Sequence, residues 1–337
     1  MAVLGMQERP SRAKLILAFA AVYIIWGSTY LAIRYAIETL PPLLMAGGRF
    51  LTAGTVLYLW ARAQGASRPA LREWRPAAII GGLLLLGGNG MVVLAERDVP
   101  SGLAALLIAT EPMMVVLLDW LRPGGDRPAG KTVLGLMLGF VGMLLLIGPS
   151  GLAGEGGVAP LGATLLIAAT VSWAAGSLYA AKRKLVDSPV MAAAMQMLTG
   201  GTLLLLAGLV TGEAAGFAVA EVSLRSLTAF FYLIIFGSLI GFTSYSWILR
   251  VTPPSIAATY AYVNPVVAVL LGWALAGEPL TARTLLAAAV IIAAVALITT
   301  NRGHSGSQGQ AKSKSRRRLF NPFAPRLPRR RYVETGD

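Results

Sequence analysis

The sequence predicts an all-α integral membrane protein with ten transmembrane helices, arranged as two inverted five-helix repeats with both termini in the cytoplasm. Three observations lead to this prediction: an apolar composition, a series of helix-length hydrophobic segments and an internal repeat. Hydrophobic residues make up 56% of the 337 positions and charged residues 13%. A soluble domain with this balance would have more apolar surface than it could bury. The lipid bilayer must therefore be the solvent.

The hydrophobic segments have the length that a transmembrane helix needs, since about 20 residues cross a hydrocarbon core of roughly 30 Å. Breaker residues such as Pro41 and Pro42 separate them with short connections, as expected of a packed helix bundle. The predicted spans are 14–33, 42–60, 76–95, 101–121, 132–148, 159–181, 190–211, 227–248, 255–276 and 283–300.

A phrase within the fourth span recurs in the ninth, 153 positions later. Each copy has one polar residue directly before a proline, Glu111 before Pro112 and Asn264 before Pro265. Such symmetry between two hydrophobic halves is typical of secondary transporters. The matching residues are Pro100, Ala104, Ala105, Pro112, Val116, Leu117, Leu118 and Trp120, which recur as Pro253, Ala257, Ala258, Pro265, Val269, Leu270, Leu271 and Trp273.

The positive charges set the expected orientation, because Arg and Lys are retained on the cytoplasmic side. With the N terminus inside, 14 Arg and Lys residues before the tail fall inside and four outside. Five spans in each half then invert the second repeat. The expected parts are a cytoplasmic segment 1–13, a first repeat 14–148, an extracytoplasmic linker 149–158, a second repeat 159–300 and a disordered basic tail 301–337.

Polar residues near the ends of the first and sixth spans are candidate gates. Ser28 and Tyr30 fall near the outer end of one, and Ser177 and Tyr179 near the inner end of the other. Inversion would place these two pairs at opposite mouths of one pathway. The alternative is that the serines allow close helix packing and the tyrosines belong to an interfacial aromatic belt.

Arg49 and Glu111 are the charged residues expected at depth in the membrane. A charged side chain there costs at least about 2.5 to 3.5 kcal/mol and is retained mainly beside a cavity or a partner. Arg49 lies seven residues from Pro42 and Glu111 ten from Ser101, so their depths are compatible with contact. They could form a structural ion pair, present opposite charges to a zwitterionic substrate, or use Glu111 as a proton carrier.

Pro112 and Pro265 are predicted to kink their helices, because each removes a backbone hydrogen bond. The freed carbonyls, those of Ile108 and Ala261, could bind a substrate at a site framed by Glu111 and Asn264, or the kinks could serve packing alone. Further residues are candidates either for lining the cavity or for hydrogen bonding between helices. These weaker candidates are Asn89, Trp173, Ser246 and Tyr262.

Several phrases resemble the EamA-type ten-helix exporters of the drug/metabolite transporter superfamily. They are Trp26 to Tyr30 with Ile33 and Arg34, Leu40 to Pro42, Gly48 to Phe50, Gly88 to Gly90 before Ala95 and Glu96, and Ser255 to Pro265. The resemblance covers roughly residues 10 to 300. It implies two EamA modules, a central cavity and efflux of small metabolites such as amino acids from the cell through the inner membrane. Uptake or exchange of another metabolite class is the alternative.

Other function classes fit the sequence less well. An intramembrane enzyme would need a nucleophile with a base or a metal site, yet the sequence has no cysteine and its one histidine, His304, lies in the tail. A structural subunit would not need charges at mid-depth. The net charge of +14 is dispersed between apolar segments, so no nucleic-acid partner, metal or cofactor is expected. The basic tail is expected to be a solvated topology anchor or to contact anionic lipid.

Overall fold

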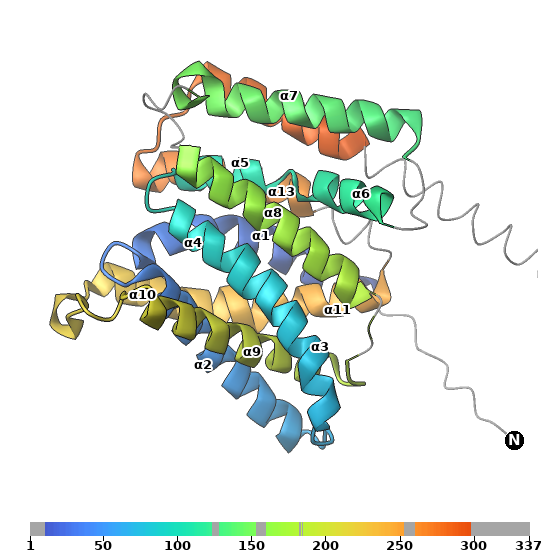
Figure 1. Cartoon of the computed structure of the whole chain (residues 1–337), viewed down its shortest axis with the longest axis vertical. Helices are drawn as coiled ribbons and strands as arrows, with labels where there is room; N and C mark the ends of the chain where they lie inside the picture. Colours follow the sequence, from blue (N-terminus) through green and yellow to red (C-terminus); the bar gives the residue numbers. More distant parts are fainter. Residues whose placement is uncertain are drawn as a thin grey trace, which may run out of the picture.

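The structure is a computed structural model that describes residues 11–122, 128–152, 160–181, 183, 185–252 and 260–297. Within these ranges every regular element is a helix (Figure 1). The elements are α1 (Arg12–Ala36), α2 (Pro42–Ala63), α3 (Leu71–Gly81), η1 (Gly82–Gly90), α4 (Met91–Ala95), α5 (Ser101–Ile108), α6 (Glu111–Leu121), α7 (Gly130–Leu152), α8 (Pro160–Ala181), α9 (Pro189–Val210), η2 (Val219–Glu221), α10 (Leu224–Tyr232), η3 (Leu233–Phe242), α11 (Thr243–Val251), α13 (Tyr260–Ala276) and a last helix, Ala282–Leu297.

The second helix of each repeat begins and ends in the same way. Proline occupies the first turn of both α2 and α9, where its missing N–H costs no hydrogen bond. Two residues beyond each helix, a glycine adopts a positive φ, 83° at Gly65 and 80° at Gly212. Only glycine enters this region without strain, so it ends both helices sharply.

Seven helical segments of the described chain are long and apolar enough to cross a membrane. One of them joins α3, η1 and α4, another joins α5 and α6, and a third runs from α10 into α11. Three further apolar helices are shorter, Gly130–Leu146, Val263–Ala276 and Ala282–Leu297. The ten-span topology therefore stays a prediction. The segment through residue 10, residues 153–159 of the linker and the tail 301–337 lie outside the described residues.

The packing between helices repeats itself when the two halves of the chain are exchanged. In the first repeat α1 packs on η3 and α13, and in the second α8 packs on η1 and on α5 and α6. Similarly, α2 contacts η3 whereas α9 contacts η1. The helices α2 and α9 pack along one another as the most extensive helix pair among the described elements. Each repeat thus completes its core with helices of the other repeat.

The helix α7 and the last helix form a layer of their own at the top of Figure 1. A Cβ atom at Gly142 of α7 would lie 2.7 Å from Ile291 Cγ1 of the last helix, so the two helices are in close contact. Met143 and Leu146 are buried there with Ala287 and Val295. This layer therefore covers the side of the bundle that α5 and α8 form.

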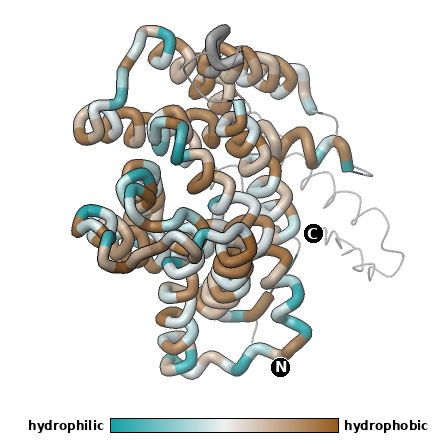
Figure 2. Tube along the Cα trace, turned by 60° about the vertical axis from the view of Figure 1, so that its left-hand side comes forward, coloured by the Kyte–Doolittle hydropathy of each residue, from teal (hydrophilic) through white to brown (hydrophobic). Residues whose placement is uncertain are grey.

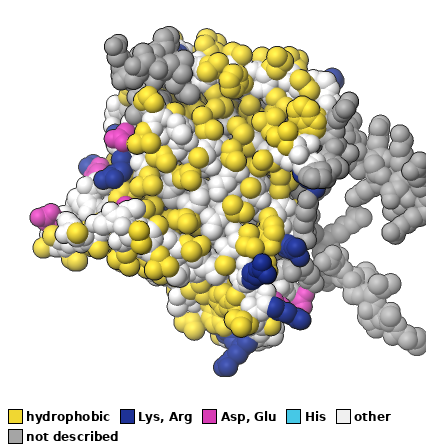
Figure 3. Space-filling model, in the orientation of Figure 1, with side chains coloured by type: hydrophobic (Ala, Val, Ile, Leu, Met, Phe, Trp, Pro, Cys, Tyr) yellow, Lys and Arg dark blue, Asp and Glu magenta, His cyan; other side chains and the backbone are white. Residues whose placement is uncertain are grey.

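The outer surface is largely apolar. Hydrophilic residues gather in the connections between helices (Figure 2). Hydrophobic side chains cover much of the face in Figure 3, and the charged ones lie mainly toward two of its edges. Large apolar side chains such as Leu17, Val210 and Trp273 are more than half exposed. A surface of this kind requires a nonpolar surrounding, which the bilayer provides.

Adding a methyl group at Gly201 tests the central contact between α2 and α9. A Cβ atom there would lie 2.9 Å from the backbone nitrogen of Leu51 and 3.1 Å from the carbonyl oxygen of Gly47. Gly201→Ala should therefore cost about 1–3 kcal/mol of stability, as overpacking does. The midpoint of thermal unfolding in detergent measures this loss of stability. Gly130→Ala is the control, because no atom lies within 4 Å of its Cβ; equal behaviour of both variants would contradict the close packing.

Candidate functional site

A cavity of about 80 Å³ lies inside the bundle, between helices of both repeats. It has room for several water molecules, so a larger ligand requires its walls to move apart. The walls are mainly aromatic and apolar, but Arg49, Asn89, Glu111 and Asn264 also reach it. The other lining residues are Trp26, Thr29, Tyr30, Ile33, Phe50, Leu85, Gly88, Val92, Ile108, Ala169, Thr170, Trp173, Gly237, Phe242 and Tyr260.

Arg49 of α2 brings a positive charge to this cavity. Its side chain is only 3% exposed. Its Nε donates a hydrogen bond to Ser238 Oγ at 2.8 Å, and the guanidinium carbon lies 4.6 Å from the centre of the Phe50 ring. Within the part of the chain that the structure describes, Nη1 has no hydrogen-bond partner. Because a buried charge needs partners, this nitrogen is available to an anionic group in the cavity.

Two π-helical stretches form opposite walls, η1 in the third span and η3 in the eighth. Such stretches are rare and often mark functional sites. A main-chain carbonyl of each accepts a hydrogen bond from the first helix of the other repeat: Leu83 from Ser172 Oγ at 2.8 Å, and Gly237 from Trp26 Nε1 at 3.2 Å. The repeat in the sequence gave no sign of this change in helix type.

Glycines in these stretches make room for the polar and aromatic lining. A Cβ atom at Gly237 would lie 2.7 Å from Arg49 Nη2, and one at Gly88 would lie 2.8 Å from Trp173 Cε3. The absence of a side chain at these two positions thus lets Arg49 and Trp173 pack against the backbone beside the cavity.

Glu111 brings a negative charge to the cavity at a break in the fourth span. Helix α5 ends at Ile108 and α6 begins at Glu111, with Pro112 in its first turn. A carboxylate at a helix N-terminus is favoured by the helix dipole. Glu111 is 5% exposed, and Tyr260 Oη donates to its Oε2 at 3.5 Å. Arg49 and Glu111, predicted at compatible depths, therefore line one cavity.

Asn264 faces the same cavity from α13, one residue before Pro265 inside that helix. With its amide oriented to satisfy both atoms, its nitrogen donates to the carbonyls of Tyr23 at 3.0 Å and Tyr260 at 3.3 Å. The bond to Tyr23 joins α13 to α1, and the bond to Tyr260 lies within α13. Asn264 thus combines a structural role with a position on the cavity wall.

Four aromatic rings pack on one another next to these polar groups. Trp26 lies with its ring centre 4.9 Å from that of Tyr245, 5.5 Å from Tyr260 and 5.9 Å from Trp173. Three of the four line the cavity. Their faces and edges provide surface for an apolar or cationic part of a ligand.

Some of the remaining candidate residues line the cavity and others lie elsewhere in the bundle. Asn89, Trp173 and Tyr30 line the cavity, whereas Ser246 is partly buried and is not among the lining residues. The side chain of Tyr262 lies outside the described part. Among the candidate gates, Ser28 shares a hydrogen bond of 2.6 Å with Tyr232 Oη, Ser177 is partly buried near Tyr245, and Tyr179 lies 5.7 Å below the guanidinium of Arg183.

Sequence reasoning gave no role to two buried acids near one end of the cavity, Glu96 and Glu278. Glu278 is 8% exposed and accepts hydrogen bonds from Ser101 N and Oγ, both at 2.7 Å, and from Gly102 N at 3.0 Å. Arg34 Nε lies 3.7 Å from its Oε1. Glu278 therefore caps α5 from a distant part of the chain. Both acids follow an apolar span in the sequence, a position that gives no sign of burial.

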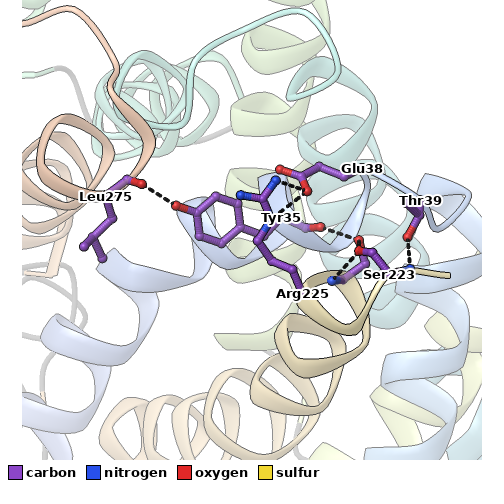
Figure 4. Close-up of polar contacts among 7 residues, drawn as sticks. Tyr35, Glu38, Thr39, Ser223, Arg225 and Leu275 are labelled. Atoms are coloured by element: carbon purple, nitrogen blue, oxygen red, sulfur yellow. Dashed lines mark hydrogen bonds and ion pairs between the residues drawn. The ribbon is translucent and has the colours of Figure 1, made fainter.

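Further polar contacts join α1 to other helices at this end (Figure 4). Tyr35 Oη donates to the carbonyl of Leu275 at 2.8 Å, and Arg225 forms an ion pair with Glu38, with Nη2 at 2.6 Å from Oε2. Ser223 N donates to Thr39 Oγ1 at 3.1 Å. These contacts hold α1 against α13 and against the start of α10, so they close this end of the bundle.

No group of three or more His, Cys, Asp or Glu side chains that could hold a metal ion occurs among the described residues. The site instead combines opposite charges, hydrogen-bonding groups and aromatic surface, which can bind a small molecule with both polar and apolar parts.

The sequence profile of the EamA-like transporter family matches residues 13–148 and, a second time, residues 160–300. The chain belongs to this family. An Escherichia coli (strain K12) protein described as "Uncharacterized inner membrane transporter YedA" is 42% identical over 288 residues, which are 85% of this chain and 90% of the relative. Together with the apolar spans, this relationship makes the chain a multi-pass transporter of the inner membrane.

Other similarities are more distant. A "Probable terminal-alkyne amino-acid exporter" of Streptantibioticus cattleyicolor is 28% identical over 307 residues, 90% of this chain and 99% of the relative. The "Uncharacterized transporter YvbV" of Bacillus subtilis (strain 168) is 26% identical over 88% of this chain and 94% of its own length. A solved crystal structure, 22% identical, matches 86% of this chain and 98% of its own with a TM-score of 0.61, which shows that it shares the fold.

Removing the Glu278 carboxylate from this EamA-like transporter should destabilise it. Glu278→Ala leaves two backbone N–H groups at the buried start of α5 without their acceptor, at a cost of about 1–3 kcal/mol. The melting temperature in detergent should fall. Glu221→Ala, at an exposed position in η2, is the control. Equal melting temperatures for parent and Glu278→Ala would contradict the capping role.

Proposed function

We propose that this EamA-like transporter exports small zwitterionic metabolites, amino acids or related amphiphilic compounds, by alternating access. The observation that carries the proposal is that Arg49 and Glu111 both line one internal cavity. A zwitterion presents one carboxylate and one ammonium, which match these two charges. The aromatic wall of Trp26, Trp173 and Tyr260 suits the apolar part of such a compound.

The relationship of the two repeats supports alternating access. Helices of both repeats enclose the cavity, and packing contacts recur when the repeats are exchanged. Two arrangements of such halves can open the cavity to one side and then to the other. We further propose ten spans with cytoplasmic termini, Ser28 and Tyr30 toward the outer mouth, and Ser177 and Tyr179 toward the inner one. The contacts of Figure 4 would then form the closed outer gate.

Export of amino acids also agrees with the relative from Streptantibioticus cattleyicolor, which is 28% identical and is described as a "Probable terminal-alkyne amino-acid exporter". Uptake or exchange of another class of small metabolite is the alternative, and the direction and cargo of the measured flux distinguish the two.

Neutralising either charge in the cavity should abolish transport without unfolding the protein. Arg49→Gln and Glu111→Gln each remove one contact to a zwitterion, so efflux of labelled amino acids from proteoliposomes should fall to background. Arg72→Gln and Glu221→Gln, at exposed positions, are the controls and should transport like the parent.

A purely structural ion pair would behave differently. Each single variant would then leave an uncompensated buried charge, at a cost of about 3–5 kcal/mol, and the double variant would recover stability. Normal transport by a folded double variant would remove both residues from the mechanism.

The proposed orientation can be tested with cysteines, since the native chain has none. Ser67→Cys lies in the exposed connection after α2 and Ala220→Cys in η2, on the opposite side of the membrane in the proposed topology. An impermeant thiol reagent applied to intact cells should label Ala220→Cys and leave Ser67→Cys unlabelled until the cells are opened. The reverse pattern would place the termini outside.

A further inference from the structure

Glu96 is a buried acid without the partners that a buried carboxylate needs. It directly follows the span Leu71–Ala95, and its side chain is 1% exposed. Neither of its carboxyl oxygens has a hydrogen-bond partner among the residues that the structure describes. An ionised carboxylate in such a place costs several kcal/mol, so buried acids without donors bind a proton instead.

The charged and titratable groups around Glu96 come from three other parts of the chain. Arg34 and Tyr30 belong to α1, Arg49 to α2, and Glu278 to the connection after α13. The helix α8 packs along α4 and carries no charged residue. Burial raises the pKa of Glu96 well above its usual range, the carboxylate of Glu278 raises it further, and Arg34 and Arg49 lower it.

Of the charged neighbours, Glu278 and Arg34 are engaged with other groups, and Arg49 is engaged only in part. Glu278 has three hydrogen-bond donors and Arg34 beside it. Arg49 is held through Nε by Ser238, but its Nη1 has no partner in the described chain. Glu96 and Arg49 interact electrostatically across the space between them, and no hydrogen bond joins the two. This is the arrangement expected if Glu96 is neutral.

The balance of buried charges also indicates that Glu96 is neutral. In the described chain the buried charged side chains are Arg49, Glu96, Glu111 and Glu278. Arg34, 37% exposed, supplies a second cation beside Glu278. Two cations thus face three acids. Glu111 lines the cavity and has Tyr260 as a donor, whereas Glu96 is not among the lining residues and has no donor among the described residues. Glu96 is therefore the acid best placed to carry the missing positive charge as a proton.

We propose that Glu96 is a proton-binding site that controls the availability of Arg49. Protonated Glu96 leaves the guanidinium to the substrate's carboxylate. When Glu96 releases its proton to water, its carboxylate competes with the substrate for Arg49. Binding of proton and substrate would thus favour one another, so the two would cross together, and the outward substrate gradient rather than an inward proton gradient would drive export. The competition with substrate rests on the proposed function, whereas the proton site itself does not.

Infrared difference spectroscopy of the full chain in lipid nanodiscs tests the site without any substrate. The parent should show the C=O band of a protonated carboxyl group at neutral pH, and the band should disappear as pH rises. Glu96→Gln should lack this band and Glu111→Gln should keep it. A parent without the band, or a band that only Glu111→Gln removes, would overturn the proposal.

Stability gives a second readout. Since the pKa is raised in the folded state, the stabilising effect of protonation is complete below the unfolded pKa and is lost as pH rises through the folded pKa. The melting temperature of the parent should therefore drop across that range, and Glu96→Gln should show a smaller drop. Gln has the shape of the protonated acid, so a Glu96→Gln chain that fails to fold, or that keeps the full pH dependence, contradicts the proposal.

Transport in proteoliposomes tests the competition for Arg49. A pH gradient that is acidic on the side from which a mixture of labelled amino acids starts should stimulate its flux in the parent, and Glu96→Gln should lose this stimulation while keeping a basal flux. Stimulation that survives in Glu96→Gln, or a parent that ignores the gradient, would overturn the coupling. A parent that moves none of these compounds would refute the proposed substrate class, and the spectra would still decide whether Glu96 holds a proton.

Discussion

The structure depends on one constraint: polar groups inside an apolar bundle have to find their partners within the protein, because lipid offers none. The starts of α2 and α5 illustrate it. Both follow a proline, Pro41 or Pro100, whose side chain cannot cap the helix. Glu213 supplies the acceptors for Leu43 N and Leu44 N, and Glu278 supplies those at Ser101 and Gly102. Each acid comes from the second repeat and caps a helix of the first, so capping also joins the two repeats.

The same constraint explains how the bundle tolerates irregular helices beside the cavity. A π-helical stretch alters the regular pattern of backbone hydrogen bonds, and in both η1 and η3 a carbonyl accepts from a side chain of the opposite repeat. The irregularity also brings small residues to the wall, where Gly237 adjoins Arg49 and Gly88 adjoins Trp173. Because the two stretches are equivalent under exchange of the repeats, each half contributes one adaptable wall. Movement of one repeat against the other would therefore change the shape of the cavity from both sides.

The sequence predicted the helical class and the repeat, because apolar length is readable along the chain. It also named Arg49, Asn89, Glu111, Trp173 and Asn264 among its candidates for one site, and these five line one cavity, whereas the candidate Ser246 does not. It did not predict the π-helical stretches, since helix type depends on packing partners such as Ser172 and Trp26. Glu96 was missed for a different reason. It stands next to Arg97 and Asp98 after a hydrophobic span, a pattern typical of an exposed loop, and only the folded arrangement of α1, α2 and the chain after α13 buries it. The number of spans and their orientation depend on the membrane, which the pattern of charges describes only indirectly.

The buried acids also show why substrate and proton need different sites. A zwitterion carries no net charge, so its binding between Arg49 and Glu111 leaves the excess of acid over base in the bundle unchanged. A group with net positive charge has to balance that excess. A proton is the smallest such group, and it can bind a carboxylate that has no room for a ligand beside it. Glu111 faces the cavity, where a substrate ammonium can reach it, whereas Glu96 is fully buried and is not among the residues that line the cavity, so we expect a proton to be its ligand. Arg49 interacts with Glu96 and also borders the cavity, so its guanidinium is the group through which the two binding events influence each other.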